Sequence, residues 1–270
     1  MRWQGRRESG NVIDQRRSGA GKMGAGGLII GAIVYYLMGG NPLVYLAQNA
    51  DSVQQSAPMA EGQDADNKSF AAVVLADTED VWTNEFQQAS QSYKAPEMVL
   101  FRGSVRSACG NASAAMGPFY CPADQRVYLD LSFFDELSRK LGASGDFAGA
   151  YVIAHEVGHH IQTLLGLDQA AREQQSGMSK AAGNQVSIQV ELQADCLAGV
   201  WAKQTERTKN VLEEGDIEEA MRAASAVGDD TLQQRSQGYV VPDSFTHGTS
   251  EQRQSAFQKG YSGGQLRSCV

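Results

Sequence analysis

The sequence has only four cysteines and four histidines in 270 residues, and its 31 acidic residues outnumber its 23 basic ones. Four cysteines are too few for a small scaffold that disulfides hold together in place of a core. Hydrophobic residues make up 42% of the chain, which excludes a protein that is disordered throughout. The length suits one globular domain of about 200 residues with an additional segment.

The basic residues are concentrated at the start of the chain. Residues 1–23 contain six basic and two acidic side chains, a net charge of +4, so the remainder of the chain carries −12. Because phosphate groups bind to basic surfaces, this acidic remainder indicates a protein without a nucleic-acid partner.

An uncharged apolar run follows this basic head directly. Residues 24–46 read GAGGLIIGAIVYYLMGGNPLVYL, and a membrane-spanning helix needs roughly 17–25 such residues. With basic residues before the run and acidic residues after it, the positive-inside rule predicts a cytoplasmic head at 1–23 and an exported body. We therefore predict a single-pass protein anchored in the membrane by one N-terminal helix; a cleaved signal peptide and a buried core helix are the alternatives.

The remaining residues divide into a linker and one domain. Residues 47–69 are polar and rich in Gln, Ser, Ala and Asp, which is typical of a linker. The apolar spacing of residues 70–270 predicts an α+β domain that is mostly helical with a small sheet. We expect helices at 70–92, 132–141, 146–165 and 184–206, strands at 98–105 and 126–131, and a loop at 106–118.

Three of the four histidines lie in one short segment, His155-Glu156-Val157-Gly158-His159-His160. His155 and His159 are one helical turn apart, so both rings project from the same face of the helix and can bind one Zn²⁺. Glu156 is then close enough to act as the general base on a zinc-activated water. His160 is expected to have a structural role, with metal binding as the alternative.

A catalytic zinc site needs a third protein ligand. A third histidine six residues after the second is excluded, because that position is Leu165. Glu191 and Asp195, in the segment ELQAD of the next long helix, are again one helical turn apart. We predict that Glu191 is the third ligand and that Asp195 accepts a hydrogen bond from the far nitrogen of a ligand imidazole.

Four motifs occur in a specific order: GPFYCPADQRVYLDL at 117–131, HEVGHHIQ, ELQADC, and SFTHGTSEQR at 244–253. Together they resemble the bacterial neutral zinc metallopeptidase family, a membrane-anchored group, over nearly the whole chain. The resemblance implies a zincin-like fold, a Zn²⁺ cofactor and a protein or peptide substrate. With the charge pattern, it predicts a location in the bacterial inner membrane, with the peptidase domain in the periplasm or outside the cell.

Two further expectations concern the substrate. Peptidases of this architecture bind a peptide along an edge strand, and Val127–Leu131 is the candidate, with an interior strand as the alternative. His247 is the first candidate to stabilise the negatively charged oxygen of the reaction intermediate, and Arg253 is the second. Ordinary turn and surface roles are the alternatives for these two residues, and Tyr151 is expected to contribute mainly to packing.

The four cysteines are expected to form two disulfides, because an exported domain meets an oxidising environment. Three pairings are possible. We favour Cys109–Cys121, which closes a short loop, and Cys196–Cys269, which fastens the end of the chain to the helix of Glu191. Reduced thiols, or Cys196 as a zinc ligand, are the alternatives.

The sequence thus predicts a zinc-dependent endopeptidase in which His155, His159 and Glu191 bind Zn²⁺ and Glu156 is the general base. The alternative is a zinc-binding envelope protein without catalytic activity, an interaction or chaperone-like module. The sequence predicts no particular oligomeric state.

Overall fold

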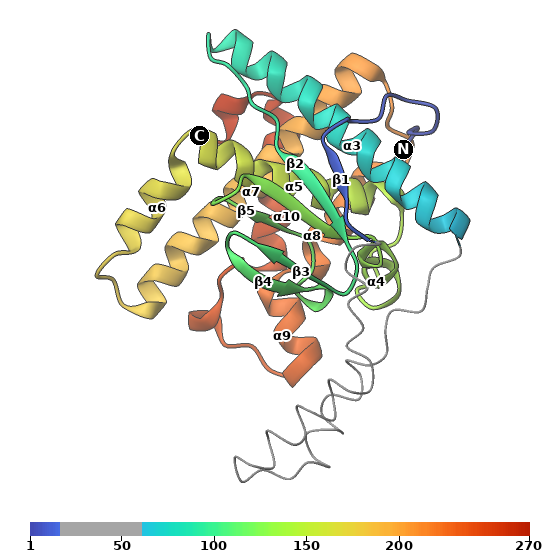
Figure 1. Ribbon diagram of the computed structural model, residues 1–270. Helices are drawn as coiled ribbons and strands as arrows, with labels where there is room; N and C mark the ends of the chain where they lie inside the picture. Colours follow the sequence, from blue (N-terminus) through green and yellow to red (C-terminus); the bar gives the residue numbers. More distant parts are fainter. Residues whose placement is uncertain (17–60) are drawn as a thin grey trace, which may run out of the picture.

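The structure, a computed structural model, describes residues 1–16 and 61–270 (Figure 1). Its helices are α3 (Glu61–Gln88), α4 (Phe133–Arg139), α5 (Asp146–Leu164), α6 (Leu167–Gln175), α7 (Lys180–Lys209), α8 (Asp216–Ala226), α9 (Asp229–Gln237) and α10 (Ser250–Gly263). Its strands are β1 (Val12–Asp14), β2 (Glu97–Phe101), β3 (Ser104–Ser107), β4 (Gly110–Ser113), β5 (Phe119–Cys121) and β6 (Arg126–Asp130). The described residues are therefore mostly helical with small sheets, which confirms the predicted α+β class.

The main sheet has the strand order β1-β2-β6-β5. The strands β1, β2 and β6 are parallel, and β5 runs antiparallel to β6. All but the first residue of β2 and of β6 are buried, as expected for strands that are covered on both faces. Since β6 lies between two neighbours, the prediction that residues 127–131 form an edge strand is wrong, and the edge on this side of the sheet is β5.

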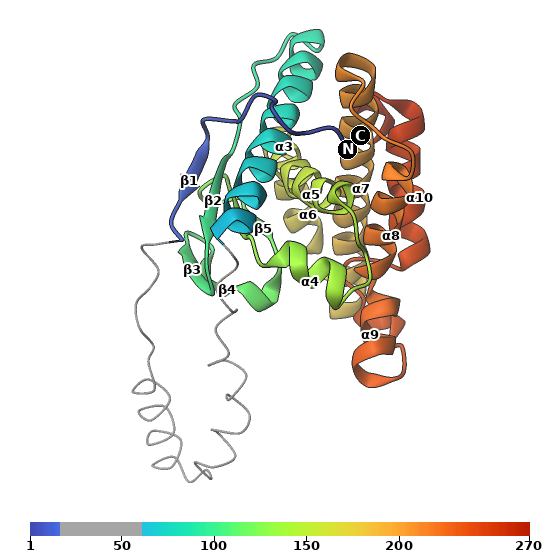
Figure 2. The same ribbon diagram turned by 90° about the vertical axis from the view of Figure 1, so that its right-hand side faces the viewer.

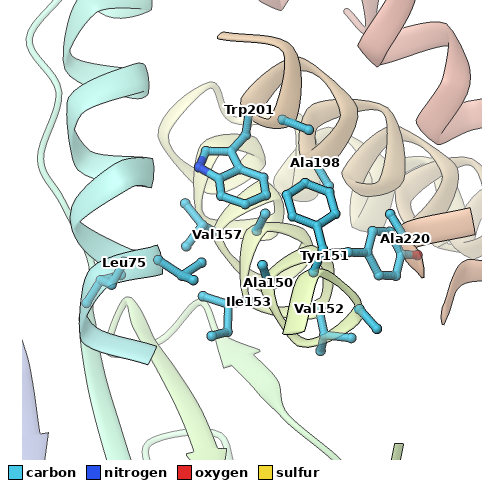
Figure 3. Packing of buried hydrophobic residues seen from close by; sticks show 14 of the residues in the cluster. Leu75, Ala150, Tyr151, Val152, Ile153, Val157, Ala198, Trp201 and Ala220 are labelled. Atoms are coloured by element: carbon cyan, nitrogen blue, oxygen red, sulfur yellow. The ribbon is translucent and has the colours of Figure 1, made fainter. Parts of the chain in front are cut away.

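Three layers are visible in Figure 2: the main sheet, then α3 and α5, then α7, α8 and α10. Helix α5 lies in the middle and contacts β5, β6, α3, α7 and α8. Its small residues, among them Ala148, Ala150 and Ala154, are fully buried and let these elements approach closely. Figure 3 shows Tyr151 of α5 and Trp201 of α7 in the same buried cluster, in which the Phe147 ring of α5 stacks on Trp201 with 5.7 Å between ring centroids. Because native cores are closely packed, a helix enclosed in this way holds its side chains in fixed positions.

The predicted helices are present, and several of their boundaries differ from the prediction. Helix α5 corresponds to the prediction at 146–165, and α7 extends the prediction at 184–206 at both ends. Helix α3 begins at Glu61, so the predicted linker at 47–69 extends too far and the domain begins before residue 70. Residues 61–69 have a polar composition because they form the outer end of α3, where Asp64 pairs with Arg16 and Arg102.

Residues 104–113 form an antiparallel hairpin, β3 and β4, where we expected the end of a strand and a loop. The small polar residues of this segment do not alternate with apolar ones, so the pattern typical of a strand is missing. Both disulfides have the favoured pairing. Cys109–Cys121 fastens the hairpin to β5, and Cys196–Cys269 fastens the end of the chain to α7.

The first sixteen residues, called here the N-terminal arm, belong to the folded body. Strand β1 pairs with β2, with Val12 opposite Met98, and Met1 is buried in the main core. The prediction of a separate head at 1–23 is therefore wrong for residues 1–16.

The predicted membrane anchor at 24–46 lies outside the described residues, as does the linker up to residue 60. Among residues 1–16 and 61–270, no helix combines the length and the apolar character that a membrane crossing requires.

Candidate metal centre

Two imidazoles and one carboxylate meet between α5 and α7. The Nε2 atom of His155 lies 3.1 Å from Oε2 of Glu191, and Nε2 of His159 lies 3.5 Å from Oε1 of the same carboxylate. One ligand atom from each of the three residues lies within 4.8 Å of the others. The structure thus brings together the three residues that the sequence predicts as ligands.

The outer nitrogen of each ring has a partner that can only accept a hydrogen bond. Nδ1 of His155 lies 2.8 Å from a carboxylate oxygen of Asp195, and Nδ1 of His159 lies 2.8 Å from Oε1 of Gln162. Both Nδ1 atoms are therefore donors, and in the neutral rings each Nε2 has a lone pair directed at Glu191. Lone pairs of nitrogen and carboxylate oxygen repel each other, so either a proton on the ring or a metal ion must lie between each Nε2 atom and the carboxylate. This geometry fits a divalent metal ion with His155, His159 and Glu191 as its protein ligands.

The contribution of Gln162 was not predicted from the sequence. Its amide is held in one orientation, because Nε2 donates to the carbonyl of Val190 and to Oε1 of Gln193. Oε1 is thereby left to accept from His159. The spacing of three residues between His159 and Gln162 was the available signal, because residues i and i+3 lie on the same face of a helix.

A close crossing of α5 and α7 makes the centre possible. A Cβ atom at Gly158 would lie 3.0 Å from the carbonyl oxygen and 3.2 Å from the Cα atom of Ala194. Ala194 lies on α7 between Glu191 and Asp195, so the missing side chain lets both carboxylates reach the rings on α5. This agrees with the expectation that Gly158 permits the approach of another backbone.

Behind His155, Asp195 takes part in a buried network. Arg253 donates from Nε to Oδ2 of Asp195 at 2.8 Å and from Nη2 to Oδ1 at 2.9 Å. The hydroxyl of Tyr151 donates to Oδ1 at 2.5 Å. Asp195 is fully buried and Arg253 is 4% exposed. Arg253 is therefore engaged with Asp195 and orients it, which does not suit the oxyanion role considered for this residue.

The charges of the site follow from burial and from these partners. Burial opposes a charge on His155, but Asp195 and Glu191 outweigh it and raise the pKa of His155 to about 10. Burial also opposes ionisation of Glu191, yet His159 and His155 hold the pKa of Glu191 well below its ordinary value. Burial raises the pKa of Glu156. Of the two carboxyl groups, Glu191 is the fixed anion and Glu156 is the one ready to take up a proton.

The three predicted ligands and Glu156 line a cleft of about 560 Å³. The edge strand β5 forms part of its wall through Phe119 and Tyr120, and apolar side chains such as Phe133 and Leu232 extend it. A larger hollow of about 690 Å³ between α6, α7 and α10 contains none of the histidines. The cleft therefore joins the metal centre to β5, the strand at the edge of the sheet among the described residues.

His247 also lines this cleft, on the segment between α9 and α10. Its Nδ1 lies 3.2 Å from Oδ1 of Asp229, whose other oxygen accepts from the backbone NH of His247 at 2.6 Å. The hydrogen bond with Asp229 raises the pKa of His247. His247 thus lies in the same cleft as the metal centre, and Asp229 is a partner that the sequence does not predict.

His160 lies away from the metal centre. Its Nε2 donates to the carbonyl of Lys94 at 2.7 Å, so its Nδ1 accepts from the hydroxyl of Tyr120 at 3.0 Å. Both nitrogens are used, which leaves no lone pair for a metal ion and agrees with a structural role. Since Tyr120 belongs to β5, His160 fixes the edge strand to α5.

Replacing His160 with phenylalanine is expected to destabilise the fold by about 1–3 kcal/mol, because the fully buried ring loses two partly buried hydrogen bonds, to Lys94 and to Tyr120. Urea denaturation measures this loss. Tyr120→Phe, which removes one of the two bonds, is the matched control and should cost about 1 kcal/mol. Zinc titration should give the wild-type affinity for both variants, and loss of the metal in His160→Phe would contradict a structural role.

Comparison with known proteins agrees with these features. A family model described as "Putative neutral zinc metallopeptidase" matches residues 1–270. The uncharacterized protein YpfJ of Escherichia coli strain K12 is 48% identical over 289 residues, which cover 100% of this chain and 98% of the relative. The uncharacterized protein Rv2575 of Mycobacterium tuberculosis strain H37Rv is 46% identical over 187 residues, which cover 66% of this chain and 62% of that relative. No solved structure matches the chain.

Proposed function

The chain belongs to this neutral zinc metallopeptidase family, and on that premise we propose that it is a zinc-dependent endopeptidase. The observation that carries the proposal is the meeting of His155, His159 and Glu191, with both Nε2 atoms directed at one carboxylate. When bound there, zinc supplies a positive centre that lowers the pKa of a water molecule and polarises a carbonyl group.

Glu156 is the proposed general base. It lines the cleft beside the ligands, and its carboxylate makes no hydrogen bond with any described residue. It takes a proton from the attacking water and delivers the proton to the nitrogen of the leaving amine. The raised pKa of Glu156 suits this double role, since the group must both accept and release a proton near neutral pH.

The edge strand β5 is the proposed support for the substrate backbone. It pairs only with β6 among the described strands, and Phe119 and Tyr120 border the cleft. An extended peptide added to this edge would be fixed by main-chain hydrogen bonds, as in other proteins that bind peptides by β-augmentation. The wall of apolar side chains favours apolar residues in the peptide.

His247 is the proposed donor to the substrate oxygen that becomes negatively charged. Replacing it with alanine should lower kcat about 10²-fold or more, as loss of an oxyanion donor does in other peptidases, without changing zinc content.

Because Asp229 raises the pKa of His247, the cationic ring persists to higher pH. Activity that needs this cation falls as the pH rises through the raised pKa, so Asp229→Asn should move the alkaline limb of the pH–rate profile to lower pH. An unchanged profile would contradict the pairing.

Cleavage of an unfolded protein tests the function. The purified full-length chain is incubated with unfolded casein, with a chelator, and with zinc added back after the chelator. We expect casein fragments that disappear with chelator and return with zinc, together with one zinc per chain by metal analysis and none in His155→Ala. Stoichiometric binding of casein without cleavage would instead indicate a zinc-binding, non-catalytic module.

A further inference from the structure

The N-terminal arm is joined to the body by backbone hydrogen bonds. The amide of Met98 donates to the carbonyl of Asn11, and the amide of Gln15 donates to the carbonyl of Leu100, both at 2.8 Å. These bonds enclose the three residue pairs between β1 and β2. The arm is therefore a strand of the main sheet, and its pairing has a defined register.

Three of the four arginines of the arm, Arg6, Arg7 and Arg16, have acidic partners on α3. Arg6 lies 2.5 Å from Asp77, which is buried, and Arg7 lies 2.6 Å from Asp80. Several of the charges that suggest a cytoplasmic head under the positive-inside rule are thus neutralised within the fold. The charge pattern of the sequence therefore has a second explanation, which needs no membrane topology.

The apolar residues of the arm are part of the core. Met1 is 4% exposed, and the Trp3 ring packs edge-on against Phe70 with 5.6 Å between ring centroids. The amino group of Met1 lies 2.6 Å from Asp146 at the start of α5 and 3.1 Å from Asp216. Withdrawing the arm would expose this apolar surface and remove the ammonium group that pairs with the buried carboxylate of Asp216, which is costly.

The chain leaves and rejoins the described body at one place. Arg16, the last described residue before the gap, donates to the carboxylate of Asp64 at 2.7 Å and to its backbone carbonyl at 3.2 Å. Residues 16 and 64 are therefore neighbours in space, although 47 residues separate them in the sequence. The described residues on the two sides of the gap therefore lie on the same part of the surface.

We propose that residues 1–16 and 61–270 lie on the same side of the membrane in the cell. Strand pairing cannot extend across a hydrocarbon core of about 30 Å. This arrangement of the described residues does not agree with a cytoplasmic arm and an exported body, the topology that the charge pattern predicts. The two disulfides indicate that the shared side is the exported, oxidising one.

Labelling of single cysteines in the full-length chain tests this proposal. Glu8→Cys places an exposed thiol on the arm and Glu218→Cys places one on α8 of the body, while the four native cysteines are in disulfides. Spheroplasts that express each variant, without an N-terminal tag, are treated with a membrane-impermeant maleimide before and after lysis. We expect both thiols to react equally before lysis. Protection of both until lysis would also support a shared side but assign it to the cytoplasm, whereas protection of Glu8→Cys alone would overturn the proposal.

A cross-link tests the pairing itself in the membrane fraction. Val12→Cys with Met98→Cys joins residues that are opposite each other, and Val12→Cys with Leu100→Cys, two residues out of register, is the matched control. Mild oxidation should give a disulfide-linked peptide pair by mass spectrometry in the first variant and at least several-fold less in the second. Equal, low yields in both would show that the arm is not paired with β2 in the cell and would overturn the proposal.

Discussion

Replacing Glu156 with glutamine is expected to lower kcat/KM by roughly 10²–10⁴-fold while the chain keeps one zinc, because this is the usual contribution of a general base. The amide has nearly the same shape as the carboxylate but cannot take up a proton. Glu156 is not one of the three residues that meet at the metal centre, so its replacement should leave metal binding intact. The measurements are cleavage of a fluorogenic peptide and metal analysis of the same preparation.

A matched control for this variant is Glu173→Gln. Glu173 lies exposed on α6, where it accepts a hydrogen bond from Gln169, away from the cleft. It should retain wild-type activity. Substantial peptide cleavage by Glu156→Gln would remove the assignment of the base, and loss of zinc from that variant would show that Glu156 supports the metal centre.

The core of the site was predictable because it depends on local helical spacing. His155 and His159 on α5, and Glu191 and Asp195 on α7, are each four residues apart, and one turn of a helix places such pairs on one face. The scarcity of histidine made the first pair conspicuous. Both disulfides were also favoured correctly, because one closes a short segment and the other joins the only two cysteines that remain.

The supporting residues were not predictable in the same way. Arg253 looked like a helix-surface residue or an oxyanion donor, since no sequence pattern shows that α10 packs behind α7 and presents it to Asp195. Asp229 begins a different helix from the one that follows His247, so their contact depends on how the two helices are arranged. Polar residues with long-range partners look like surface residues until the tertiary structure is known.

The basic head shows the same problem at the level of the whole chain. Its composition agrees with a topology signal, and the apolar run beside it strengthens that interpretation. Yet three of its arginines, Arg6, Arg7 and Arg16, pair with acidic residues of α3 that lie some fifty to seventy positions further along the chain. An excess of basic residues in a segment can therefore arise in two ways. It can be a membrane-orientation signal, or the segment can supply the basic partners of ion pairs whose acidic partners lie elsewhere in the fold.

Replacing Arg253 with methionine is expected to destabilise the zinc-loaded protein by about 3–5 kcal/mol, because it leaves the charge of Asp195 buried and unpaired. Asp195 has no exposed surface, so water cannot replace the guanidinium. Its remaining partners, Tyr151 and His155, are themselves buried. Urea denaturation in the presence of zinc measures the loss.

The double variant Asp195→Asn with Arg253→Met separates stability from function. Removing both charges together should recover most of the lost stability, because a buried ion pair contributes little when neither charge remains. It should not recover the metal centre, because His155 then lacks the carboxylate that orients its ring. Zinc affinity should be about 10–100-fold below wild type, which is the usual effect of losing such a partner. If Arg253→Met alone were as stable as wild type, the charge on Asp195 would have to be satisfied by His155 and Tyr151 without the guanidinium. If instead the double variant bound zinc with wild-type affinity, Asp195 would have no part in holding the ligand imidazole.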